Sequence, residues 1–206
     1  MNPYDELLKS ITLRSMDGKG DSDKHALTLL GIALSINAKN IIELGVRDCK
    51  TTEPLLWAAA YNNGTVYSVD INDIDKSKID TLFHYNWLTY KMDSIQFLET
   101  YQDKIKHPID LVYIDDWHSY EHVKRELEIL DRIVTPKTVI VLHDLMYGET
   151  CPYYHTDLTL KDGQWANGGP YRAVAELNSQ FWEFSTIPAN NGLTILRKKY
   201  TNLYGR

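Results

Sequence analysis

The amino-acid sequence predicts an α/β protein with a Rossmann-like, doubly wound and mostly parallel sheet that ends in a C-terminal antiparallel hairpin. Short apolar runs rich in β-branched residues alternate along the chain with segments of helical periodicity. The loops between them are short, which is typical of parallel strands joined by crossover helices. Two last apolar runs, split by "ANN", indicate the hairpin.

In the first half of the chain, helical and extended patterns alternate. Helices are expected at residues 25–37, 51–62, 77–88 and 94–105, and strands at 40–45, 64–71 and 88–94. Thr51 or Thr52 is expected to cap the second of these helices, and Pro54 is tolerated in its first turn.

The second half continues this pattern and then loses it. A strand is expected at residues 109–115, a helix at 119–134, a strand at 138–144, a helix at 171–180 and the two hairpin strands at 182–188 and 192–199. Val123, Leu127, Leu130 and Val134 fall on one face of the first helix. Residues 146–169 lack periodicity, so they are expected to form either a lid over an acceptor or a surface insertion.

Composition limits the classes of function. The chain has 206 residues, 43% of them hydrophobic, which suits a single domain over residues 1–206. A net charge of −6 without a long basic run argues against a nucleic-acid partner. No apolar run approaches membrane-spanning length, so a soluble cytoplasmic protein with no membrane partner is expected. Cys49 and Cys151 sit in no C-x-x-C context, and neither a disulfide framework nor a zinc site is predicted.

Polar residues or a glycine follow four of the five strands expected before residue 145. They are Glu43 with Gly45, Asp70, Asp115 with Asp116, and His143 with Asp144. In open α/β sheets, ligands bind outside the carboxyl ends of the strands. One such group alone is ordinary at a strand end, but the concurrence of four favours a ligand site. There, a glycine admits close backbone approach, an acid can accept ribose hydroxyls, and paired acids suit a hard divalent cation.

The segments "IIELGVRDCKTT", "VYSVDI", "MDS", "IDLVYIDDWHSYEHVKREL" and "VIVLHDL" resemble class I S-adenosylmethionine-dependent methyltransferases. The resemblance covers about residues 22–145 and is strongest to metal-dependent O-methyltransferases of small molecules and sugars. It implies methyl transfer from S-adenosylmethionine to a hydroxyl of a small molecule, with a sugar as one candidate acceptor. The oligomeric state stays open, and a homo-oligomer is one expectation.

The resemblance also implies roles for individual residues. It places Glu43, Gly45 and Thr51 near the methionine end of the cofactor, Asp70 on the ribose hydroxyls, and Asp93 with Ser94 near the adenine. Asp115 belongs both to this cofactor set and to a divalent-metal site, for Mg²⁺ or Mn²⁺, that Asp115, His143 and Asp144 would form. His118, three residues beyond Asp115, corresponds to a histidine that the sugar-methylating relatives keep. It is predicted to be the general base, since an unperturbed imidazole is largely neutral at physiological pH.

Two departures from the family pattern keep other interpretations open. Cys49 stands where the first loop usually has its second glycine, and His143 stands where a carboxylate or amide is usual. Histidine is a poor magnesium ligand and suits manganese, iron or zinc better. A binding module without turnover is therefore one alternative. A nicotinamide-dependent oxidoreductase is another, which the missing G-x-G-x-x-G spacing disfavours.

Overall fold

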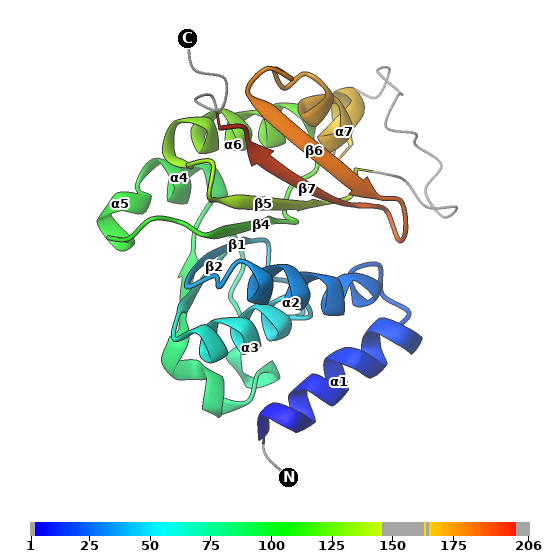
Figure 1. The fold of residues 1–206 in the computed structure, drawn as a ribbon, viewed down its shortest axis with the longest axis vertical. Coiled ribbons are helices and arrows are strands. Elements are labelled where there is room, and N and C mark those ends of the chain that lie inside the picture. Colours follow the sequence, from blue (N-terminus) through cyan, green and yellow to red (C-terminus); the bar gives the residue numbers. More distant parts are fainter. Residues whose placement is uncertain (1–2, 146–162, 164, 201–206) are drawn as a thin grey trace. The chain divides into compact units, whose positions relative to one another are not determined.

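The computed structural model describes residues 3–145, 163 and 165–200, and the chain divides into two compact units, Met1–Asp116 and Trp117–Arg206. Figure 1 shows the elements of both units. The single domain expected over residues 1–206 stays a prediction. Most of the expected lid at 146–169 lies outside the described residues, which include only 163 and 165–169 of it.

The first unit contains a parallel four-stranded sheet. Its strands are β1 (Asn40–Leu44), β2 (Thr65–Asp70), β3 (Trp87–Lys91) and β4 (Leu111–Ile114). They lie in the order β3-β2-β1-β4, and each neighbouring pair is parallel. Ile42 of β1 pairs with Tyr67 on one side and Val112 on the other. Ile42 and Val112 are completely buried, as expected of parallel strands covered on both faces.

Helices cover this sheet. They are α1 (Pro3–Asp17), α2 (Ala26–Ser35), α3 (Thr52–Asn62), α4 (Ser94–Glu99) and α5 (Tyr101–Lys104), with a 3₁₀ turn η1 (Asp23–His25) before α2. In Figure 1, α2 and α3 lie side by side. Among the described helices, none combines the length and the apolar character needed to cross a bilayer.

Helix α1 was not predicted from the sequence. Tertiary contacts hold it in place. Ile11 is completely buried, and the Arg14 guanidinium lies 2.8 Å from the carboxylate of Glu53 in α3. The indole nitrogen of Trp57 in α3 also donates to the carbonyl oxygen of Tyr4 at 2.9 Å. The helix is therefore stabilised by contacts with residues that lie far away in the sequence.

The helix predicted at 77–88 is wrong. The structure has two short 3₁₀ helices instead, η2 (Lys76–Lys78) and η3 (Thr81–Asn86), and then β3. The Asp75 and Asp80 carboxylates accept hydrogen bonds from the backbone N–H groups two residues further on, at Ser77 and Leu82. Such local bonds compete with the helical ladder, so the chain turns twice where its apolar spacing suggested one helix.

The helix predicted at 94–105 is present but interrupted. Thr100 has φ −115°, which separates α4 from α5. Its hydroxyl donates to the carbonyl oxygen of Gln96 at 2.8 Å. A β-branched residue that bonds the preceding turn is a common point of helix distortion.

The second unit contains an antiparallel sheet of three strands. They are β5 (Val139–His143), β6 (Trp182–Ile187) and β7 (Leu193–Lys198), in the order β5-β7-β6. The hairpin predicted at the C-terminal end is therefore confirmed. The other expected strands are confirmed as well, within a few residues at their ends.

Two helices, α6 (Tyr120–Ile133) and α7 (Gly169–Ala175), lie side by side in this unit, with the 3₁₀ turn η4 (Ala166–Gly168) before α7 (Figure 1). Helix α6 begins where expected, because the Ser119 hydroxyl accepts from the N–H of His122. Its predicted apolar face is buried. Helix α7 begins two residues earlier than predicted, with Pro170 in its first turn, and ends five residues earlier.

Candidate functional site

The Glu43 carboxylate lies buried at the end of β1, among hydroxyl groups of its own unit. It accepts hydrogen bonds from Thr51 at 2.9 Å, from Thr52 at 2.9 and 3.0 Å, and from Ser68 at 2.6 Å. The Trp87 indole donates in turn to the Ser68 hydroxyl at 2.9 Å. Thr51 occupies the N-cap position of α3, but its side chain makes no cap hydrogen bond. The predicted pair of Glu43 and Thr51 is thus brought together by a direct bond.

Burial raises the pKa of Glu43 to about 7, although the hydroxyl donors act in the opposite direction. Desolvation outweighs them because the side chain is completely buried. Glu43 therefore changes its protonation state near neutral pH, in the middle of the hydrogen bonds that join β1, β2 and the start of α3.

Gly45 is required by the close approach of the protein's own backbone. It has φ +86°, and a Cβ atom built on it would lie 2.2 Å from the carbonyl oxygen of Asp115. The sequence suggested that this glycine lets backbone approach a ligand. The structure gives a second reason, which is that the loop after β1 passes directly over the end of β4.

The carboxylates of Asp70 and Asp93 accept hydrogen bonds from backbone amides. Asp70 accepts from Val46 at 2.9 Å, from Arg47 at 3.2 Å and from Asn72 at 2.8 Å, and so fixes the loop that follows Gly45. Asp93 caps α4 by accepting from the N–H of Gln96, and Ser94 is the first residue of that helix. These roles in the loops leave the expected contacts to ribose and adenine as predictions.

The loop between β1 and α3 has a left-handed backbone at alternate residues. Gly45, Arg47 and Cys49 have φ values of +86°, +49° and +60°. Cys49 stands where the family pattern has a second glycine, and it takes the backbone conformation that favours glycine. Its thiol is buried, and burial raises its pKa to about 11. The thiol is therefore no nucleophile at neutral pH.

Asp115 lies just beyond β4 in the first unit. The hydroxyl of Tyr113 donates to its Oδ2 at 3.0 Å. This bond holds the carboxylate at the carboxyl end of the strand, where the sequence places it.

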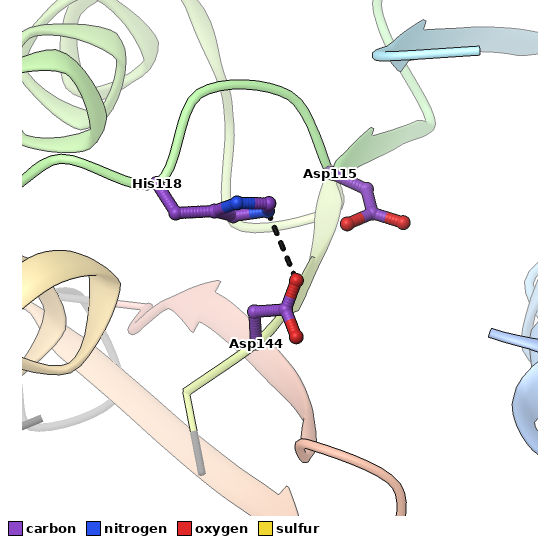
Figure 2. Close-up of side chains that lie close together, drawn as sticks. All are labelled: Asp115, His118 and Asp144. Atoms are coloured by element: carbon purple, nitrogen blue, oxygen red, sulfur yellow. Dashed lines mark ion pairs between the residues drawn. The ribbon is translucent and has the colours of Figure 1, made fainter. Parts of the chain in front are cut away.

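In the second unit, the end of β5 brings three predicted residues together. Oδ2 of Asp144 lies 3.0 Å from Nε2 of His118 and 3.2 Å from Nδ1 of His143. Figure 2 shows the His118 imidazole directed at the Asp144 carboxylate. His143 and Asp144 are buried, and Asp144 has φ +66°, so a left-handed backbone carries this carboxylate.

The two imidazoles determine the charge of Asp144. Burial acts to raise the pKa of this carboxyl, but the interactions with His118 and His143 outweigh it, and the pKa lies below the usual aspartate value. Among the residues that the structure describes, none donates a hydrogen bond to Oδ1, which is buried as well. Within the described part of the chain, Asp144 is thus an ionised carboxylate with one oxygen close to two imidazole nitrogens and the other oxygen without a donor.

Sequence reasoning missed Trp165. Its indole stacks on the His118 imidazole, with the ring centroids 4.5 Å apart and the planes within 5° of parallel. Trp165 falls in the segment without periodicity, where no pattern assigns a partner. The only local signal is "NGGP", three residues of high turn propensity and a proline, which marks a tight turn beside it.

The donor set in the second unit fits a divalent metal of borderline character. Among the described residues, His118 and Asp144 belong to a group whose ligand atoms lie close enough together to hold a metal ion, whereas the predicted ligand His143 belongs to no such group. Mixed nitrogen and oxygen donors of this kind suit manganese, iron or zinc better than magnesium. The same arrangement also suits acid–base chemistry, since a carboxylate that accepts from an imidazole orients the ring and fixes its tautomer.

Comparison with known proteins places this geometry in a family. A family model described as a methyltransferase domain matches residues 42–145, which is half of the chain. Among curated proteins, no sequence matches the chain significantly. The match gives no support to the nicotinamide-dependent alternative.

Several solved structures have a similar fold. An O-methyltransferase from Bacillus cereus, solved in complex with SAH, has a TM-score of 0.71 and 17% identity, covering 95% of this chain and 90% of that one. TomG, an O-methyltransferase from Streptomyces achromogenes involved in tomaymycin synthesis and solved with SAM, has a TM-score of 0.67 and 16% identity, covering 87% and 81%.

A third structure includes a metal ion. The MycE methyltransferase from the mycinamycin biosynthetic pathway was solved with Mg, SAH and mycinamycin VI. It has a TM-score of 0.56 and 18% identity, covering 82% of this chain and 47% of that one. At these identities the likeness shows a shared fold, and it confirms the predicted Rossmann-like α/β class. The chain therefore belongs to the methyltransferase-domain family and has the class I fold of S-adenosylmethionine-dependent methyltransferases.

Proposed function

We propose that the protein is an O-methyltransferase that transfers the methyl group of S-adenosylmethionine to a hydroxyl of a small molecule, with His118 as the general base. The observation that carries this proposal is the bond between His118 and the ionised carboxylate of Asp144. Family membership supplies the reaction class. The O-methyltransferases from Bacillus cereus and Streptomyces achromogenes, which have a similar fold, support the choice of oxygen as the acceptor.

The imidazole has a clear task in such a reaction. Bound S-adenosylmethionine supplies an electrophilic methyl carbon on a positively charged sulfur. An aliphatic hydroxyl is a weak nucleophile, so His118 takes its proton as the oxygen forms its bond to that carbon, and the carbon–sulfur bond breaks. Asp144 stabilises the imidazolium that results. A base of this kind typically contributes about 10²–10⁴-fold to the rate.

The cofactor is proposed to bind at the strand ends of the first unit. Asp70 would accept the ribose hydroxyls, and Asp93 with Ser94 would lie near the adenine. Glu43, Gly45, Thr51 and Asp115 would lie near the methionine end. The hydrogen bonds of Glu43 and Asp70 with their own loop support a preformed pocket wall, since they fix the loop before any ligand binds.

A divalent cation is proposed to assist, with Asp115, His143 and Asp144 as its ligands. The carboxylate of Asp144 and the imidazole of His118, which lie close enough together to share an ion, support a manganese-like ion. Titration of Mn²⁺ followed by electron paramagnetic resonance should show one bound ion per chain, and none in Asp144→Asn. Full activity in the presence of excess EDTA, with no bound Mn²⁺ at saturation, would remove the metal from the proposal.

The proposed function is tested by methyl transfer itself. Tritiated S-adenosylmethionine should label some members of a panel of monosaccharides, catechols and hydroxy acids. The O-methylated form of each labelled compound serves as its matched control and should stay unlabelled. Binding of S-adenosylhomocysteine without transfer to any hydroxyl would favour the alternative of a binding module.

A further inference from the structure

The turn at Trp165–Gly169, directly before α7, lies against the proposed base. Two of its residues contact His118. The Trp165 indole covers one face of the His118 imidazole, with the two ring centroids 4.5 Å apart. At Gly169, a Cβ atom would lie 2.9 Å from the carbonyl oxygen of His118 and 3.3 Å from the Trp165 ring. The close packing leaves no space for a side chain at residue 169 while the two rings stay stacked.

The backbone of this turn is unusual and is held from two sides. Asn167, Gly168 and Gly169 have φ values of +56°, +90° and +53°, so three consecutive residues have a positive φ. The Asn167 side-chain amide donates to the carboxylate of Glu121 in α6. The Arg172 guanidinium of α7 donates to the backbone carbonyl oxygen of Asn167 at 3.4 Å. A sparsely populated backbone persists where its surroundings determine it, and such turns cluster at functional sites.

A histidine needs two constraints before its ring is fixed. The χ2 torsion of histidine is broad, so a hydrogen bond at one ring nitrogen leaves the ring free to pivot. In this protein, Asp144 fixes the Nε2 edge of His118, and the Trp165 indole fixes the plane. Together they give one ring orientation, which a proton transfer to His118 requires.

We propose that the Trp165–Gly169 turn positions His118, with Trp165 as the residue that sets the plane of the imidazole. Trp165 acts through His118, so it is a positioning residue. The role in turnover rests on the proposed function of His118, whereas the stacking itself is a property of the chain without ligands.

The stacking is tested by NMR of the histidine ring protons in the unliganded protein. The resonances of His118 are identified by their loss in His118→Gln. In Trp165→Leu they should move downfield, because the shielding by the indole face is lost, and in Trp165→Phe they should move less. Phe184→Leu, an exposed aromatic residue of β6 in the same unit, is the matched control and should leave them in place. Unchanged His118 resonances in Trp165→Leu would overturn the proposal.

The positioning role is tested by turnover with the best acceptor of the hydroxyl panel. Trp165→Leu should lower kcat by about 10- to 100-fold, as expected for a misplaced catalytic group, and leave the Kd of S-adenosylhomocysteine unchanged. Trp165→Phe should recover most of the loss. In a His118→Ala background the same substitution should cost nothing further, and an additive loss would overturn the proposal. If His118→Ala itself retains full turnover, the proposed base fails, and the NMR result still decides the stacking.

Discussion

The ends of β1 and β5 each carry a buried carboxylate, Glu43 and Asp144, but the chain treats the two differently. Glu43 accepts hydrogen bonds from three hydroxyl side chains, and Asp70 accepts from three backbone amides. At Asp144, two imidazoles share one carboxylate oxygen, and the other oxygen accepts from none of the described residues. A buried acceptor that receives no donor from the described residues is costly for the fold.

The difference separates two uses of a carboxylate at a strand end. In the first unit, the acids build the loop on which a cofactor would rest. In the second unit, the acid holds titratable groups that suit proton transfer and metal binding. Substitutions in the two regions should therefore affect different measurements, with stability and cofactor affinity changing in the first and turnover in the second.

The largest effect is expected from His118→Gln. Turnover should fall by about 10²–10⁴-fold, because the acceptor hydroxyl loses its base. The affinity for S-adenosylhomocysteine, measured by calorimetry, should stay unchanged. His122→Gln is the matched control, since His122 lies one turn into α6 with Nε2 3.5 Å from the buried Glu126 carboxylate. An equal loss in both variants would assign the effect to the start of α6 as a whole.

A large loss of stability is expected from Gly45→Ala. The left-handed backbone costs a non-glycine residue about 1–2 kcal/mol, and the clash with the Asp115 carbonyl adds about 1–3 kcal/mol. Gly31→Ala is the control, because Gly31 lies within α2 with no atom within 4 Å of its Cβ position. Gly31→Ala should raise the free energy of unfolding by about 0.5–1 kcal/mol. Urea denaturation measures both, and equal stability of the two variants would contradict the close approach of the loop to β4.

Glu43 should make stability depend on pH. Its pKa is about 7 in the folded chain against 4.5 for the unperturbed group. The unfolded chain therefore loses this proton first, and the stabilisation present below pH 4.5 is lost as the pH rises to 7. The free energy of unfolding should fall by about 3 kcal/mol over this range, because each unit of difference between the two pKa values corresponds to about 1.36 kcal/mol. Denaturation of the wild type and Glu43→Gln across this range should show the slope in the wild type alone. Parallel curves would assign the slope to other groups.

The smallest of these effects is expected from Asp70→Ala. Losing a charge-assisted bond to the ribose should weaken S-adenosylhomocysteine binding by about 1.5–3 kcal/mol, or one to two decades in Kd. Asp110→Ala is a matched control, because Asp110 also accepts two backbone amides, from Lys39 and Asn40, at the opposite end of β1. It should lower stability and leave the Kd unchanged. An equal loss of affinity in both would mean that Asp70 acts only through the fold.

Most of the elements could be predicted from the sequence, and the misses have two causes, local side-chain bonds and contacts between residues far apart in the chain. The helix expected at 77–88 failed because Asp75 and Asp80 turn the backbone locally, and apolar spacing does not report such bonds. Helix α1 was missed because a salt bridge and a buried isoleucine stabilise it against distant residues. Trp165 was missed because its partner, His118, lies 47 positions earlier in the chain.

The sequence by itself determined the alternation of strands and helices, the hairpin, and the acidic or imidazole residues at the ends of β1, β2, β4 and β5. These features depend on periodicity and turn propensity, which act over a few residues. Only the tertiary structure decided which carboxylates are satisfied by their own chain and which keep an available oxygen. That outcome depends on donors brought in from afar, such as Ser68 at Glu43 and His118 at Asp144. Satisfaction of a buried polar group is a property of its three-dimensional neighbours, and no local pattern encodes it.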